Sequence, residues 1–162
     1  MTTITNEVQN PDDATLILRR VLNATPERAF KAWTSPEHIQ QWMRPEPGIV
    51  VPLASMDLRA GGKFRIQMKN PDGEYFTCVG EFREVKPPER LVYTWDWEKD
   101  GCGTKFGEVE GKPSLITVEF LKMGERTELV LTHTRFATKE SRDNHAKGWA
   151  RALDNFAKFM EG

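Results

Sequence analysis

The segment from residue 115 to residue 134 constrains the fold most, because it predicts a β-hairpin with one acceptable register. Apolar and polar residues alternate on both sides of Gly124, as in strands with one buried face. A turn at residues 123–126 gives the pairs Lys122–Thr127, Phe120–Leu129, Val118–Leu131 and Ile116–His133. A slip of one residue would bury Glu119 and Glu128. His133 is therefore predicted to end an apolar row that faces the core.

A long amphipathic helix is predicted to cover that row. Between residues 138 and 161, apolar side chains recur at spacings of three and four, which is the period of one helix face. The stripe consists of His145, Trp149, Ala152, Leu153, Phe156 and Met160. Such a stripe needs an apolar surface to pack against, and the hairpin supplies one.

The rest of the chain predicts two short helices and further strands. Thr25-Pro26 and Ser35-Pro36 are typical helix starts, so helices are expected at about 26–34 and 36–43. The strands are expected at 14–22, 62–69, 74–85 and 90–98, with a proline-rich loop at 44–52. The turn Asn70–Gly73 pairs Met68 with Phe76, Ile66 with Cys78 and Phe64 with Gly80.

The order of elements predicts an α+β fold of one domain. An antiparallel sheet with the helices packed on one face buries all of the apolar faces most economically. We expect residues 1–13 to be a flexible leader and residues 14–162 to be the domain. The glycine-rich connection at 100–114 is expected to be mobile, because loops of this length are often lids or disordered.

Composition excludes several classes of function. Lys and Arg total 23 and Asp and Glu total 24, a net charge of −1, which argues against a nucleic-acid partner. The apolar runs are far shorter than the roughly 20 residues that a membrane-spanning helix needs, and residues 1–7 do not resemble a signal peptide. Cys78 and Cys102 lack metal-finger spacing, so we expect free thiols, no metal, no cofactor and a cytoplasmic location.

Several motifs together resemble one known family. They are Asn23-Ala24-Thr25-Pro26-Glu27-Arg28-Ala29-Phe30-Lys31-Ala32-Trp33, Asp57-Leu58-Arg59-Ala60-Gly61-Gly62-Lys63-Phe64, Gly80-Glu81-Phe82-Arg83-Glu84-Val85, Pro88-Glu89-Arg90-Leu91-Val92, Val118-Glu119-Phe120 and Gly148-Trp149. The chain resembles the activator-of-heat-shock-protein-90-ATPase homologue family, within the START-like, polyketide-cyclase and birch-pollen-allergen superfamily (SRPBCC). It departs from the usual pattern after Trp42, where Met43 and Arg44 replace a Trp and a Gly.

The resemblance implies a helix-grip fold with a ligand cavity. In this fold a curved antiparallel sheet, here of about six to seven strands, wraps a long C-terminal helix. It implies a shared apolar cavity but no shared catalytic set, so we predict no catalytic residue. The predicted cavity residues are Trp42, Phe64, Ile66, Cys78, Trp95, Val118, Phe120, Leu131, His133, Trp149, Leu153 and Phe156.

Three functions are compatible with the sequence. The first is a small cytoplasmic protein that binds a hydrophobic or aromatic molecule. The second is a module that contacts a chaperone, as the family name suggests. The third is a cyclase or hydrolase, which would need more converging polar groups than His133 alone.

Individual residues leave alternatives open. His133 is either a polar contact for a ligand, a general base or a hydrogen-bonded core histidine. The side chains of Trp95 and Trp149 either line a cavity or fill it. One of Arg19 and Arg20 faces inward and needs either a carboxylate partner or an acidic ligand.

Overall fold

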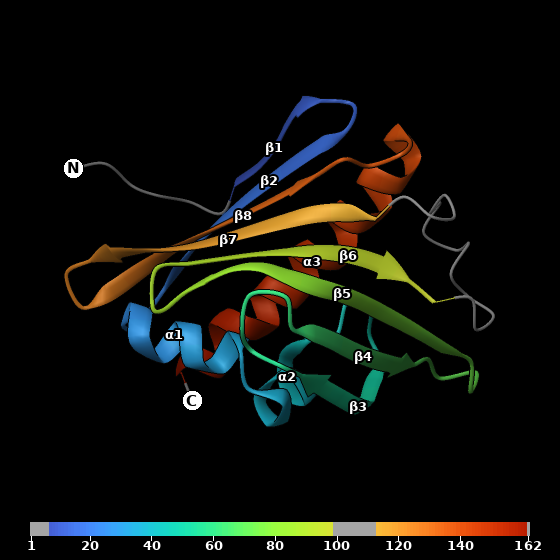
Figure 1. Cartoon of the computed structure of the whole chain (residues 1–162), viewed down its shortest axis with the longest axis horizontal. Helices are drawn as coiled ribbons and strands as arrows, with labels where there is room; N and C mark the ends of the chain where they lie inside the picture. The colour runs from blue at the N-terminus through green and yellow to red at the C-terminus, as the bar shows by residue number, and fades with distance from the viewer. Residues whose placement is uncertain (1–6, 99–112, 162) are drawn as a thin grey trace.

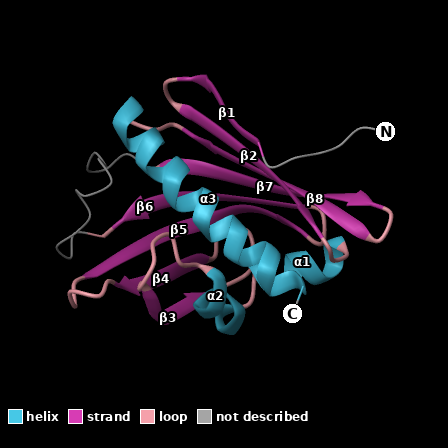
Figure 2. Cartoon of the chain, turned by 180° about the vertical axis from the view of Figure 1, so that it is seen from behind, coloured by secondary structure: helices cyan, strands magenta, loops and turns pink. Residues whose placement is uncertain are grey.

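The computed structural model describes residues 7–98 and 113–161. They form one antiparallel sheet of eight strands in the order β1-β2-β8-β7-β6-β5-β4-β3, with a long helix, α3, across one face (Figures 1 and 2). Two short helices lie beside the C-terminal part of α3. The architecture confirms the predicted α+β helix-grip fold, with one or two more strands than expected.

The element bounds follow the sequence patterns closely. The helices are α1 (Pro26–Trp33), α2 (Pro36–Trp42) and α3 (Lys139–Glu161). The strands are β1 (Glu7–Asp12), β2 (Thr15–Leu22), β3 (Val50–Met56), β4 (Lys63–Lys69), β5 (Tyr75–Lys86), β6 (Arg90–Trp97), β7 (Ser114–Met123) and β8 (Arg126–Thr134).

Both predicted hairpins have the expected register. In the β7–β8 hairpin Ile116 pairs with His133 and Phe120 pairs with Leu129. The β4–β5 hairpin pairs Met68 with Phe76, Ile66 with Cys78 and Phe64 with Gly80. Gly124 supplies the positive φ, 63°, that the β7–β8 turn requires. The inward row of β8 is fully buried, so alternation correctly assigned the core face.

The two edge strands were not predicted. Residues 7–12 form β1 and pair with β2, although we expected them to belong to a flexible leader. Residues 50–52, expected in a loop, begin β3 and include Pro52. Proline is tolerated there because an edge strand leaves one row of N–H groups unpaired. Of the predicted mobile connection, Ser114 is the first residue of β7, and residues 100–112 lie outside the described residues.

Helix α1 begins as its sequence predicts. The Thr25 side chain accepts a hydrogen bond from the backbone N–H of Arg28 at 3.3 Å, and Pro26 occupies the first turn. This cap satisfies a backbone donor that the helix cannot satisfy itself. The α1 helix then carries Phe30 and Trp33 into the core.

Helix α3 buries the predicted stripe against the sheet. All six stripe residues are at most 4% exposed. Arg20 is the arginine of β2 that faces inward: its Nε donates to Oδ1 of Asp154 on α3 at 3.2 Å, and its Nη2 donates to the Ala150 carbonyl at 3.3 Å. Arg19 lies on the other face, near Glu128. The inward arginine therefore uses a carboxylate of the protein.

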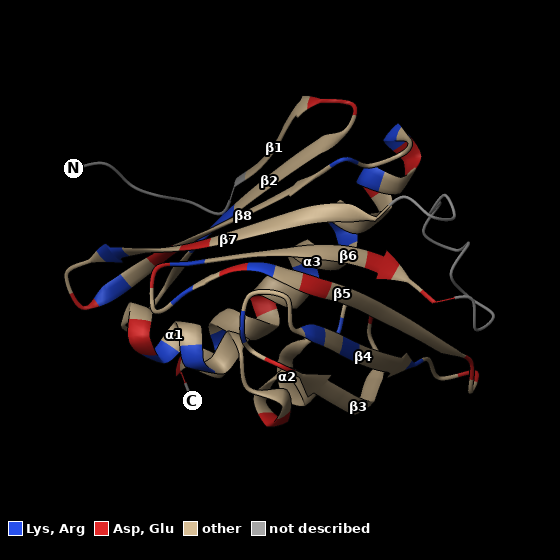
Figure 3. Ribbon diagram, in the orientation of Figure 1, with Lys and Arg blue, Asp and Glu red and all other residues tan. Residues whose placement is uncertain are grey.

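Charges of both signs are mixed over the strands and helices (Figure 3). On the outer face of the sheet, Arg65 makes a bidentate contact with Glu98, and Arg90 lies near Glu84 and Glu119. No described helix is long and apolar enough to cross a membrane.

Candidate functional site

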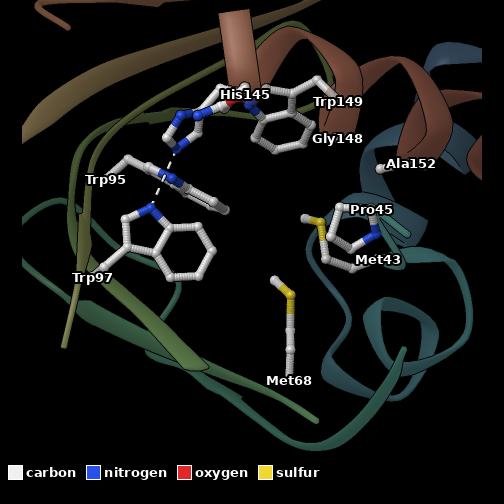
Figure 4. Close-up of a pocket in the computed structure, with 10 residues that line it drawn as sticks. Met43, Pro45, Met68, Trp95, Trp97, His145, Gly148, Trp149 and Ala152 are labelled. Atoms are coloured by element: carbon white, nitrogen blue, oxygen red, sulfur yellow. Dashed lines mark hydrogen bonds between the residues drawn. The ribbon is translucent and has the colours of Figure 1, made fainter. Parts of the chain in front are cut away.

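Two small cavities lie in the core between α3, the sheet and the segment that follows α2. The first has a volume of about 30 Å³ and is shown in Figure 4. It is lined by Met43, Pro45, Met68, Trp95, Trp97, Asn144, His145, Gly148, Trp149 and Ala152. The second has a volume of about 20 Å³. It is lined by Trp33, Thr34, Ile39, Met43, Met56, Phe64, Ile66, Phe82, Leu91, Tyr93 and Trp95.

The two cavities are neighbours, because Met43 and Trp95 line both of them. Each has room for about one water molecule, whereas small-molecule sites typically measure about 300–1,000 Å³. The core between helix and sheet is therefore largely filled by side chains in this structure. A larger site would require at least one shared side chain to move.

One wall of the first cavity is fixed by a hydrogen-bonded histidine. Trp97 Nε1 donates to His145 Nε2 at 3.2 Å, and His145 Nδ1 lies 2.8 Å from the Ser141 carbonyl. The Ser141 carbonyl can only accept, so His145 Nδ1 carries a proton, and the Trp97 N–H can only donate, so Nε2 carries none. His145 is therefore neutral. Burial lowers the pKa of His145 to about 4 and outweighs the contact with Ser141.

His133 is held in the same way, and its ring lies next to that of His145, with centroids 5.2 Å apart. Trp149 Nε1 donates to His133 Nδ1 at 3.1 Å, and His133 Nε2 lies 2.7 Å from Ser114 Oγ. The Ser114 hydroxyl donates its proton to the Trp95 carbonyl at 3.1 Å, so it accepts from His133 Nε2–H. Burial, reinforced by nearby His145, lowers the pKa of His133 well below its ordinary value.

This geometry favours one of the three roles considered for His133. The residue is fully buried, both of its ring nitrogens are engaged, and it does not line either cavity. His133 is a hydrogen-bonded core histidine that positions Trp149. His145, one helical turn before Trp149, is the histidine that reaches the cavity.

The opposite wall is made of methionines. Met43 and Met68 point toward Trp95 and Trp97 across the first cavity (Figure 4). Met56 lines the second cavity. Methionine has three rotatable side-chain bonds and adapts to irregular space. Met43, the position at which the sequence departs from the pattern of the family it resembles, lines both cavities.

A groove on the surface adjoins the first cavity. Its volume is about 270 Å³, and it is lined by Pro45, Glu46, Pro47, Asn144, Lys147, Gly148 and Arg151. Pro45, Asn144 and Gly148 line both the groove and the cavity. A Cβ on Gly148 would lie 3.1 Å from the Cβ of Pro45, so a glycine allows close contact between α3 and the segment after α2.

The structure brings only some of the predicted cavity residues to the cavities. Trp95 and Trp149 line the first, and Phe64, Ile66 and Trp95 line the second. The others are buried but line neither: Trp42, Cys78, Val118, Phe120, Leu131, His133, Leu153 and Phe156. Burial raises the pKa of the Cys78 thiol, which fits a buried apolar role for this cysteine.

The sequence held signals for some lining residues that the prediction omitted. Trp97 has the same strand parity as Trp95, and His145 belongs to the stripe that contains Trp149. Met43, the C-cap of α2, stood out in the sequence only as a departure from the pattern of the family that the chain resembles. Among the described residues, no three His, Cys, Asp or Glu side chains lie together as a metal site would require.

A curved sheet around a C-terminal helix, with apolar space between them, defines a helix-grip protein. Residues 23–161 match the family described as activator of Hsp90 ATPase homolog 1-like protein, and the chain belongs to this family. No curated protein matches the chain.

Solved bacterial structures have the same fold. A protein from Rhodobacter sphaeroides is 22% identical with a TM-score of 0.79, over 97% of this chain and 98% of that one. A protein from Chromobacterium violaceum is 24% identical with a TM-score of 0.79, over 92% and 99%. A Silicibacter pomeroyi protein titled as a member of the same family is 28% identical with a TM-score of 0.75, over 91% and 98%.

Proposed function

We propose that this protein binds an apolar small molecule in the space between α3 and the sheet. The observation that carries the proposal is the pair of neighbouring apolar cavities, which share Met43 and Trp95 and adjoin a groove open to solvent. Apolar concave sites with few polar groups are typical of small-molecule binding. The cytoplasmic location remains a prediction from the sequence.

Binding requires the two cavities to join. The tryptophan wall resists movement, because Trp97 and Trp149 are each hydrogen-bonded to a buried histidine. The methionine wall moves more easily than the tryptophan wall. The Met43 side chain makes no hydrogen bond to any described residue, so a change of rotamer breaks none. A ligand would therefore enter from the groove and displace Met43 while the tryptophans stay in place.

Two measurements test the proposal. Native mass spectrometry of freshly purified protein should detect a co-purified small molecule. The neutral dye N-phenyl-1-naphthylamine should bind with a stoichiometry near one and gain fluorescence, because it leaves water for an apolar site. Absence of dye binding would contradict the proposal and favour a role in surface interactions.

A matched pair of variants locates the site. Ala152 lines the first cavity, so Ala152→Leu should fill it and weaken dye binding at least ten-fold. Ala157 lies on the same helix, is partly buried and lines neither cavity. Ala157→Leu should bind the dye like the wild type. Equal weakening in both variants would place the dye elsewhere.

A chaperone-binding module is a second candidate. The family description supports it, and a depression of about 660 Å³ lies where α1 begins near the β5–β6 turn. Its lining includes charges of both signs, such as Glu27 and Lys86, and the exposed Leu121. Stimulation of Hsp90 ATPase activity that Leu121→Lys abolishes would support this function. Wild-type protein without any stimulation would contradict it.

A further inference from the structure

We propose that the ligand of this site is an amphipathic carboxylate. Its apolar body lies between α3 and the sheet, and its carboxylate stays in the surface groove beside Lys147 and Arg151. The inference rests on the proposed function and adds one anionic group to the apolar ligand.

The surface groove is placed to hold the end of a ligand whose body occupies the core. Pro45, Asn144 and Gly148 line both the groove and the first cavity, and Figure 4 labels the first and the last of them. The groove has a volume of about 270 Å³ and the cavity about 30 Å³. A ligand that displaces Met43 and enters the core would therefore leave its other end in the groove.

The groove carries a local positive charge, although the net charge of the chain is −1. Lys147 and Arg151 of α3 line it, and Glu46 is its one acidic lining residue. Lys147 and Arg151 are both exposed. They stand four residues apart, so they are neighbours on the helix surface, where like charges weaken a helix. An anion bound between them would remove this repulsion.

The carboxylates of α3 nearest to these two cations are engaged elsewhere. Asp143, four residues before Lys147, accepts a hydrogen bond from the adjacent arginine at 2.8 Å. Asp154, three residues after Arg151, accepts from Arg20 at 3.2 Å. Neither Lys147 nor Arg151 forms an ion pair with a described residue. Both side chains can therefore donate to a ligand, and an arginine can contact both oxygens of a carboxylate.

The interior determines which end of the ligand lies inside. No Lys or Arg lines either cavity, so a carboxylate there would be buried without a counter-charge, at a large cost in free energy. In the groove the same carboxylate keeps its contact with water and lies beside two cations. The apolar body therefore occupies the core, and the charged group remains outside.

Two amphiphiles of opposite charge test the inference. Decanoate and decyltrimethylammonium have the same apolar chain, and both can be used below the concentrations at which they form micelles. Each should displace N-phenyl-1-naphthylamine from the wild type, and decanoate should do so at about five-fold lower concentration, as expected for exposed charge pairs. The preference should shrink in about 0.5 M NaCl, because salt screens exposed charges.

Two double variants of α3 locate the carboxylate. Lys147→Glu with Arg151→Glu leaves the groove lined by acidic side chains, so it should remove the preference for decanoate or reverse it. Lys139→Glu with Lys158→Glu makes the same change in net charge at two exposed positions that line neither the groove nor a cavity. This control should keep the preference.

The outcomes distinguish this inference from the proposed function. If the dye does not bind the wild type, both are overturned. If the dye binds and the two amphiphiles displace it equally well, the carboxylate is wrong and the apolar binding site stands. A preference for decanoate that survives the groove variant, or that the control variant also loses, would overturn the inference as well.

Discussion

The two walls of the core differ in how firmly their side chains are held. On the side of α3, β6 and β8, large rings are fixed by hydrogen bonds from Trp97 to His145 and from Trp149 to His133. On the side of α2, β3 and β4, the flexible side chains of Met43, Met56 and Met68 adjoin the remaining space. The first wall gives the core one defined arrangement, and the second allows it to change. The proposed binding site uses both walls, and the following experiments compare them.

The largest effect is expected from removing a ring of the hydrogen-bonded wall. Trp149→Ala deletes a 4%-exposed side chain and the donor to His133. Urea denaturation should show a loss of about 3–5 kcal/mol. The control, Leu121→Ala at a 42%-exposed position, should change stability by less than about 0.5 kcal/mol. If Trp149→Ala lowers the free energy of unfolding by less than about 1 kcal/mol, this wall is not rigid.

Acid should weaken the same wall. The pKa of His145 is about 4 in the folded state, below the ordinary 6.5, so only the unfolded state gains a proton between these values. The contribution of neutral His145 to the free energy of unfolding is fully present above pH 6.5 and is lost as pH falls toward 4. The loss is about 3 kcal/mol, from roughly 2.5 pH units at about 1.4 kcal/mol each. His133 acts in the same direction.

Urea denaturation at a series of pH values checks this effect, with His145→Gln as the reference. Glutamine keeps one acceptor and one donor but does not titrate in this range. The wild type should lose about 3 kcal/mol relative to His145→Gln as the pH falls from 6.5 to 4. Parallel pH profiles would show that His145 does not titrate as its burial requires.

In the hydrogen-bonded wall, the loss of one oxygen atom should already lower the free energy of unfolding. Ser114→Ala removes the oxygen that accepts from His133 Nε2–H and leaves that donor buried without a partner. The free energy of unfolding should fall by about 1–3 kcal/mol. Ser114→Thr, which keeps the hydroxyl, should lose less than Ser114→Ala. The reverse order would contradict the assigned hydrogen bonds.

The smallest change is expected in the methionine wall. Met43→Leu nearly conserves volume, so it should cost less than about 1.5 kcal/mol, although Met43 is only 4% exposed. Leucine has fewer rotamers, so dye binding should become slower. A stability loss larger than that of Ser114→Ala would show that Met43 is as tightly constrained as the opposite wall.

The sequence determined the directions of side chains in the central part of the fold. Alternation in 115–134, with Leu121 and Val130 as apolar exceptions on the outer face, placed His133 inward. The three-four spacing of 138–161 placed Trp149 on the facing helix. Family motifs along the chain predicted the helix-grip fold. The edge strands escaped prediction, because β1 is mostly polar and β3 carries Pro52, so neither has the alternation of a half-buried strand.

Only the tertiary structure decided where space remains inside. Alternation and helical spacing specify which way a side chain points, whereas a cavity is the difference between the volumes of side chains that meet from distant segments. Met43 follows α2, Trp95 lies on β6 and Trp149 on α3, and their meeting leaves the two cavities. The partner of each buried polar group is settled in the same way. The sequence left open which of Arg19 and Arg20 faces inward and whether that arginine meets a carboxylate of the protein or an acidic ligand. Only the packing of α3 on β2 brings Asp154 to Arg20.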